Sequence, residues 1–98
     1  MLHIINKSPL TSTTLDSCIN TAIGGDLLLI EDAVYAATKG CSIEAKVKSA
    51  MGKFKLYVLM PDLEARGLGD RLIEGVSPVD YSGFVELTSK NKNCQSWL

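Results

Sequence analysis

Three cysteines are the residues of this chain best suited to covalent chemistry. Cys18, Cys41 and Cys94 lie far apart, without a Cys-X-X-Cys pair, and His3 is the one histidine that accompanies them. This spacing disfavours both a zinc site and a disulfide framework. Cys41 follows Gly40 where a helix is expected to begin, and the positive end of a helix dipole favours a thiolate. First principles therefore favour Cys41 as the more reactive thiol.

The two other cysteines have different surroundings in the sequence. Cys18 lies inside an expected helix, among the apolar residues Leu15, Ile19 and Ala22. A free cysteine in such a position packs as a small hydrophobic residue, so the spacing favours a buried, inert thiol. Cys94 lies in a polar segment near the C-terminus, where no neighbour organises it. Spacing by itself leaves the choice of a reactive cysteine open.

Three aspartates occupy equivalent places, because each ends an apolar run and precedes a helix-like segment. They are Asp32 in DLLLIED, Asp62 in KLYVLMPD and Asp80 in GVSPVD. Carboxylates gathered at one edge of a sheet can act as acid and base. Capping is the stronger interpretation, because an aspartate side chain accepts a hydrogen bond from an unpaired N–H of the first helical turn. If this edge has a further function, we expect a partner subunit there.

The hydroxyl-rich segment 6–14 follows the first apolar run. In doubly wound folds this is where phosphates bind, and the hydroxyls resemble the phosphate loop of flavodoxins. The glycine that would let the backbone approach a phosphate is missing, and Pro9 removes one N–H donor. A flavin site is therefore a remote alternative.

Four lysines surround Gly52 and form the most basic part of the chain. Such a cluster is most often a solvated face, and no aromatic residue interrupts it before Tyr57, so a platform for single-stranded nucleic acid is not evident. An acidic protein partner fits better than RNA. The four are Lys46, Lys48, Lys53 and Lys55.

The segments that must position these residues alternate along the chain between apolar spacing typical of strands and apolar spacing typical of helices. Strand-like runs cover 2–6, 27–30, 56–60 and a weaker 73–79, and helix-like segments cover 11–25, 33–39, 42–52, 61–66 and 81–88. Trp97 and Leu98 could add a short edge strand or dock on a neighbour. This pattern predicts an α/β three-layer sandwich, with helices on both faces of a mostly parallel sheet of about four or five strands.

Length and composition set further limits. A chain of 98 residues makes one domain that buries only roughly 60 to 65% of its unfolded surface, so its helices cover the sheet thinly and oligomerisation is a reasonable expectation. A net charge of -1 gives no general attraction to nucleic acid or anionic membranes. The start MLHIINKSP lacks the features of a signal peptide, and no apolar run has the length of a membrane span. We expect a cytoplasmic protein if the host is bacterial.

Five segments in order resemble the TusB/DsrH family from end to end. They are MLHIINKSP, LLLIEDAVYAA, YVLMPDLEARG, VDYSGFVELT and the terminal QSWL. The resemblance implies a single DsrEFH-like domain over residues 1–98 with a flavodoxin-like fold. It also implies a heterohexameric DsrEFH/TusBCD complex, in which DsrE/TusD-like and DsrF/TusC-like subunits are the companions.

The same resemblance implies a function in sulfur relay. Sulfane sulfur would pass as a cysteine persulfide to an acceptor protein of the TusE/DsrC type, for thiolation of the tRNA wobble uridine or for sulfur oxidation. Cys18, within LDSCIN, falls on the cysteine of DsrH proteins, so it is the candidate persulfide carrier and places the chain closer to the DsrH branch. The principal persulfide cysteine is expected on the DsrE/TusD-like subunit. Whether this subunit has a catalytic role of its own therefore depends on Cys18.

The resemblance also limits the other ligands and partners. Sulfur transfer between thiols requires no metal and no organic cofactor. Neither direct nucleic-acid binding nor membrane binding is implied. The alternative is a structural or docking subunit of the same complex, whose cysteines are incidental, and the remote alternative is a small flavin-binding protein of the flavodoxin type.

Overall fold

Five parallel strands form one sheet at the centre of the molecule. The computed structural model describes residues 1–97, and the strand order is β4-β3-β2-β1-β5. The prediction of an α/β fold with a mostly parallel sheet is confirmed. The strands are β1 (Leu2–Ile5), β2 (Gly25–Leu29), β3 (Phe54–Leu59), β4 (Ser77–Val79) and β5 (Cys94–Trp97).

The two edges of the sheet carry the least regular strands. Pro78 lies in β4, where the missing N–H does no harm because the strand is at an edge. The predicted strand over 73–79 is shorter, since Gly75 has φ 102° and the chain turns there before β4 begins at Ser77. Trp97 lies in β5 at the opposite edge, so the prediction of a short edge strand at this residue is confirmed. Leu98 lies outside the described residues.

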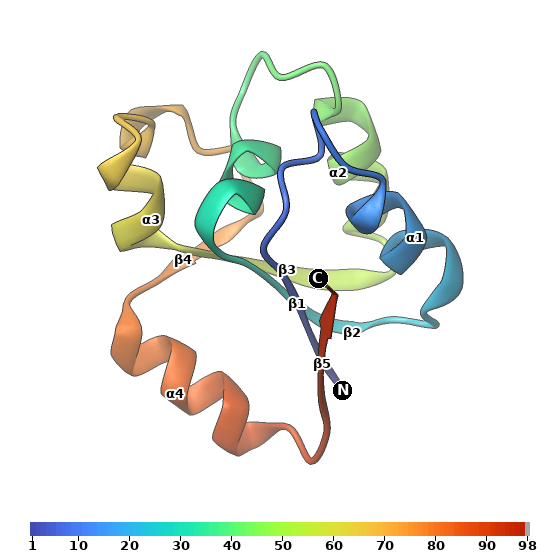
Figure 1. The fold of residues 1–98 in the computed structure, drawn as a ribbon. Coiled ribbons are helices and arrows are strands. Elements are labelled where there is room, and N and C mark those ends of the chain that lie inside the picture. Colours follow the sequence, from blue (N-terminus) through green and yellow to red (C-terminus); the bar gives the residue numbers. More distant parts are fainter. Residues whose placement is uncertain (98) are drawn as a thin grey trace.

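The helices connect the strands in two directions across the sheet. From β1 to β4, each strand is added to the sheet on the same side of the strand before it. Because such crossovers are right-handed, their helices all lie on one face of the sheet. The connection from β4 to β5 returns across the whole sheet, and its helix α4 lies on the other face (Figure 1). Across residues 1–97, no helix is long and apolar enough to cross a membrane. The helical elements are α1 (Thr14–Thr21), η1 (Glu31–Ala37), α2 (Glu44–Ala50), α3 (Met60–Ala65), η2 (Gly69–Arg71) and α4 (Tyr81–Lys90).

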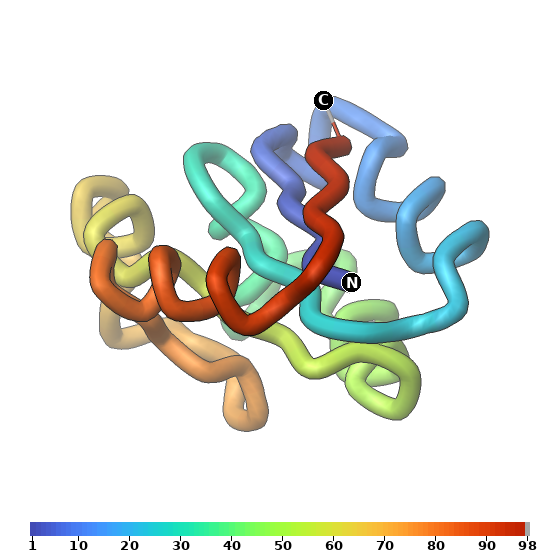
Figure 2. The backbone as a smooth tube through the Cα atoms, turned by 90° about the horizontal axis from the view of Figure 1, so that it is seen from below, coloured from blue at the N-terminus to red at the C-terminus, as the bar shows by residue number. Residues whose placement is uncertain are grey.

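The two faces of the sheet are covered unequally. Leu27 and Leu29 of β2 belong to a large apolar cluster that includes residues of α1, α2 and α3, while Leu28 between them points the other way. There it belongs to a small cluster, which α4 covers as it crosses this face (Figure 2). Thin cover of this kind agrees with what the chain length predicted. The small cluster consists of Leu2, Leu28, Tyr57 and Leu87.

Candidate functional site

Cys18 lies on the inner face of α1. Leu15 and Cys18 are one helical turn apart and both are buried, and Ile19 and Ala22 pack beside them against the large cluster. The helix rests on β1 and β5. The Cys18 side chain is fully buried, so the packing predicted from its spacing is confirmed.

This burial controls the chemistry of the thiol. Loss of hydration raises the pKa of Cys18 from 9.0 to about 11, and the positive charge of Lys53 acts weakly in the opposite direction. Roughly one thiol in ten thousand is therefore ionised at pH 7. Because the thiolate is the nucleophile in sulfur transfer, Cys18 is unreactive while α1 holds it in the core.

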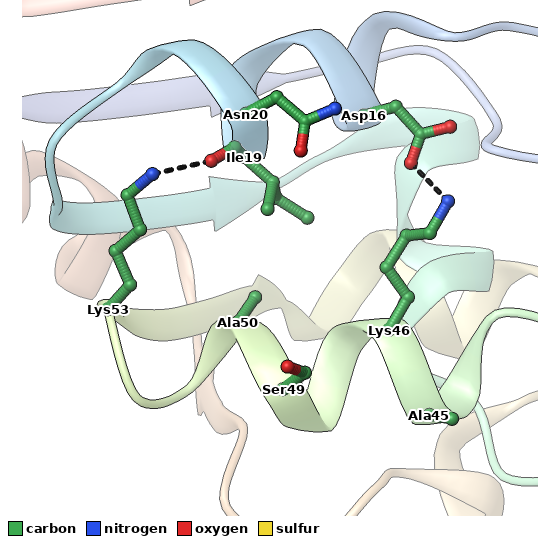
Figure 3. A pocket seen from close by; sticks show the side chains of 8 residues that line it. All are labelled: Asp16, Ile19, Asn20, Ala45, Lys46, Ser49, Ala50 and Lys53. Atoms are coloured by element: carbon green, nitrogen blue, oxygen red, sulfur yellow. Dashed lines mark hydrogen bonds and ion pairs between the residues drawn. The ribbon is translucent and has the colours of Figure 1, made fainter.

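A groove of about 670 Å³ separates α1 from α2. Two lysines bridge it, as Figure 3 shows: Lys46 of α2 pairs with Asp16 of α1, and Lys53 Nζ donates to the carbonyl oxygen of Ile19 at 2.6 Å. The side chains of Lys46 and Asp16 are 47% and 41% exposed, so their pair lies in contact with solvent. The lining residues are Asp16, Ile19, Asn20, Ala45, Lys46, Ser49, Ala50 and Lys53.

His3 joins the edge strand β5 to the rest of the sheet. Its Nδ1 accepts a hydrogen bond from Trp97 Nε1 at 3.1 Å, and its ring meets the Phe54 ring edge-on at 5.8 Å. The imidazole is buried, and this burial lowers its pKa below the usual 6.5. His3 is therefore neutral at pH 7, and its Nδ1 lone pair is occupied by the Trp97 donor.

Cys41 and Cys94 occupy more open positions than Cys18. The prediction that Cys41 opens a helix is wrong, because α2 begins at Glu44 and Ile43 is its N-cap. Cys41 is partly exposed in the preceding turn, beside a Glu44 carboxylate that accepts a hydrogen bond from the Gly40 N–H at 2.8 Å. Cys94 is exposed at the start of β5. Within residues 1–97, the structure gathers no three His, Cys, Asp or Glu side chains that could hold a metal ion.

Of the three aspartates, one caps a helix as predicted. Asp80 is the N-cap of α4, and its Oδ1 accepts a hydrogen bond from the Gly83 N–H at 2.8 Å. The capping prediction is wrong for Asp32 and Asp62. The N-cap of η1 is Ile30 and that of α3 is Leu59, and both aspartates lie inside their helices.

Asp32 and Asp62 instead connect the ends of β2 and β3. Asp62 Oδ2 accepts a hydrogen bond from the Glu31 N–H at 2.6 Å, and Asp32 pairs with Arg66 at 2.8 Å. Arg66 also donates to the carbonyl oxygen of Asp62 at 2.9 Å. Glu31 has a φ of 51°, a left-handed conformation that non-glycine residues rarely adopt. Sequence reasoning missed Arg66 and Glu31, since only contacts between distant segments define their role.

The remaining sequence motifs are engaged within the chain. Lys48 pairs with Glu44 on its own helix, and Lys55 lies over the Tyr57 ring at 5.6 Å, so the four lysines have four different partners. Ser12 and Thr14 in the hydroxyl-rich segment bond to each other at 2.7 Å. These contacts add no support for an acidic protein partner or for a phosphate site.

Comparison with known proteins gives relatives over the whole chain. The family described as "DsrH like protein" matches residues 7–94. Protein TusB of Serratia proteamaculans is 38% identical over 98 residues, which are 99% of this chain and 100% of the relative. Protein TusB of an Escherichia coli O1:K1 strain is 35% identical over 97 residues, with the same coverage.

Two solved structures share the fold. The ychN protein of E. coli superimposes with a TM-score of 0.81 at 20% sequence identity, covering 97% of both chains. A protein of unknown function from Methanobacterium thermoautotrophicum, MTH1491, gives a TM-score of 0.74 at 17% identity, covering 97% of this chain and 95% of its own. At such low identity these two structures speak for the fold alone.

Proposed function

The chain belongs to the DsrH-like family that includes the TusB proteins, and we propose that it is a subunit of a heterohexameric sulfurtransferase. The observation that carries this proposal is the family match, supported by relatives that align over their full length. Residues 1–98 would form one DsrEFH-like domain. Its companions would be DsrE/TusD-like and DsrF/TusC-like subunits, and its complex would deliver sulfur to a TusE/DsrC-like acceptor.

The proposed chemistry is transfer of sulfane sulfur between thiols. The Cys18 thiolate attacks the outer sulfur of a donor persulfide, so that a sulfur–sulfur bond forms on Cys18 and the donor leaves as a thiolate. The acceptor thiolate then attacks the outer sulfur on Cys18, and Cys18 leaves as a thiolate. One sulfur atom moves in each step, and no external oxidant or reductant is consumed.

The structure sets a condition on this role for Cys18. Its thiol is fully buried, so neither a donor nor an acceptor reaches it while α1 stays in place. Lys53 provides a positive charge that favours the thiolate. Cys18 would therefore act in a state in which α1 has moved, and it would act beside the principal persulfide cysteine of the DsrE/TusD-like subunit.

A docking role without sulfur carriage is the second candidate, and the burial of Cys18 favours it. The outer side of α4 supports contact with another subunit. Tyr81 and Val85, one helical turn apart, are 61% and 63% exposed there, above the thinly covered face of the sheet. In this role the partner subunits would supply the reactive thiols.

The branch of the family remains part of the proposal. Cys18 favours the DsrH branch and hence sulfur oxidation, whereas the curated relatives described above carry the name TusB and favour thiolation of the tRNA wobble uridine. Sulfite-reductase genes beside this one would support the oxidative branch. Flavin absorbance of the purified protein would support the remote flavodoxin-like alternative instead.

Mass spectrometry of the assembled complex tests the carrier role. The complex is loaded with a persulfide donor, and this subunit is examined for one added sulfur atom in the wild type, in Cys18→Ser and in Cys41→Ser. We expect the sulfur on the wild type and on Cys41→Ser, and its loss from Cys18→Ser. A subunit that gains no sulfur would support the docking role, and loss only in Cys41→Ser would show that Cys41 is the carrier.

A further inference from the structure

We propose that α1 is a lid that carries Cys18 on its inner face and exposes it on opening, and that two lysine contacts across the groove latch this lid to the α2 side of the molecule. The use of the exposed thiol for sulfur transfer rests on the proposed function. The opening of the lid is a property of the fold and can be measured without any sulfur donor.

The first observation is how little of α1 is buried. Leu15 and Cys18 are its two buried residues, whereas Ser17, Asn20 and Thr21 are exposed. The segments on both sides are also open to solvent, since Leu10 is 59% and Ile23 is 98% exposed. Elements with few buried apolar contacts open locally at a lower free energy than the core of a domain. The exposed outer side of α1 and its open flanking segments are what local opening of this helix requires.

The second observation is how α1 is attached on its outer flank. A groove lies between the outer sides of α1 and α2. Lys46 reaches Asp16 in the first turn of α1, and Lys53 reaches the carbonyl oxygen of Ile19 in the last turn (Figure 3). The two contacts hold opposite ends of the helix. Both use exposed, flexible lysine side chains, whose bonds to protein are readily exchanged for bonds to water.

Opening of α1 would make the Cys18 thiol more reactive. Movement of α1 removes the burial that keeps Cys18 protonated, and it releases Lys53 from the Ile19 carbonyl oxygen. The closed position of α1 thus protects the thiol, and the open position exposes it.

Thiol labelling of the full-length chain tests the lid. In a background with Cys41→Ser and Cys94→Ser, the rate of reaction with dithionitrobenzoate reports exposure of Cys18. We expect Lys46→Met and Asp16→Asn each to react about two- to fivefold faster, the range that loss of a surface ion pair allows. The double variant should react no faster than either single variant, because the two substitutions remove the same ion pair.

Lys48→Met is the matched control. Lys48 lies on the same helix and pairs with Glu44 of that helix, so its removal deletes a charge and an ion pair without touching α1. We expect its labelling rate to equal that of the background. Equal rates for Lys46→Met and Lys48→Met would refute the latch.

Denaturant dependence separates local opening from unfolding of the whole domain. We expect the labelling rate to depend on urea much less than the unfolding equilibrium does, since opening of α1 exposes a small part of the buried surface. The lid is refuted if labelling follows the urea dependence of global unfolding. If thiol labelling shows local opening but the subunit never gains sulfur, sulfur carriage is contradicted and the lid is not. If the subunit gains sulfur but labelling shows no local opening, the lid is contradicted and sulfur carriage is not.

Discussion

Asp62 offers the sharpest test of how the carboxyl edge of the sheet is held together. Its carboxylate accepts the Glu31 N–H at 2.6 Å and thereby holds Glu31 in its left-handed conformation. Asp62→Ala removes this acceptor. A hydrogen bond to a charged group contributes about 1.5–3 kcal/mol when it is well shielded. Because this bond is exposed and water can replace it, we expect a loss of unfolding free energy at or below the lower end of that range, about 1–1.5 kcal/mol.

The magnitude can be checked by thermal and urea unfolding. For a domain of this size, a loss of 1 kcal/mol corresponds to a decrease in Tm of about 4–8 °C. Asp62→Asn keeps a neutral acceptor in the same place. It should lose about half as much as Asp62→Ala, since a charge-assisted hydrogen bond is about twice as strong as a neutral one.

Asp70→Ala provides the control for the change in net charge. Asp70 is an exposed aspartate of η2, a short helix that follows α3. We expect its removal to change the unfolding free energy by no more than about 0.5 kcal/mol. The reasoning fails if Asp62→Ala is as stable as Asp70→Ala, or if Asp62→Asn is as destabilised as Asp62→Ala.

Three further predictions concern His3, Cys18 and Gly25. Burial lowers the pKa of His3 in the folded state below its ordinary value of 6.5. The contribution of neutral His3 to the unfolding free energy is therefore complete above pH 6.5 and is lost as the pH falls through the pKa of the folded state. Urea unfolding between pH 7.5 and pH 5 should show this loss. Protonation of Nδ1 also removes the acceptor for Trp97 Nε1, so amide exchange in β5 should accelerate over the same range. Cys18→Ser should cost about 1–3 kcal/mol of unfolding free energy, because it buries a hydroxyl group among apolar side chains. Cys18→Ala should cost less, and urea unfolding of the two variants measures the difference. Gly25 has φ 115° and a Cβ there would lie 2.5 Å from the Met1 carbonyl oxygen, so Gly25→Ala should lower Tm by at least about 5 °C in a thermal melt.

Local patterns in the sequence determined the kinds of element and their order. An unbroken apolar run predicts a strand covered on both faces, and β2 and β3 are such strands. The spacing of Leu15 and Cys18 placed both on the inner face of a helix, and the structure buries both. The cap at Asp80 was also predictable, because a cap is a bond between residues three apart.

Contacts between distant segments were decided by the tertiary structure alone. Asp32 and Asp62 looked equivalent to Asp80, yet each found a partner from another segment, and such competition has no signature in local spacing. The order of the strands follows from the direction of each crossover, and it leaves one face of the sheet to α4 among the described residues. Sequence periodicity identified Cys18 as a residue that packs inward. The fold determined that the helix carrying Cys18 is held by two lysine contacts from the α2 side, because only folding brings α1 and α2 to the same side of the sheet.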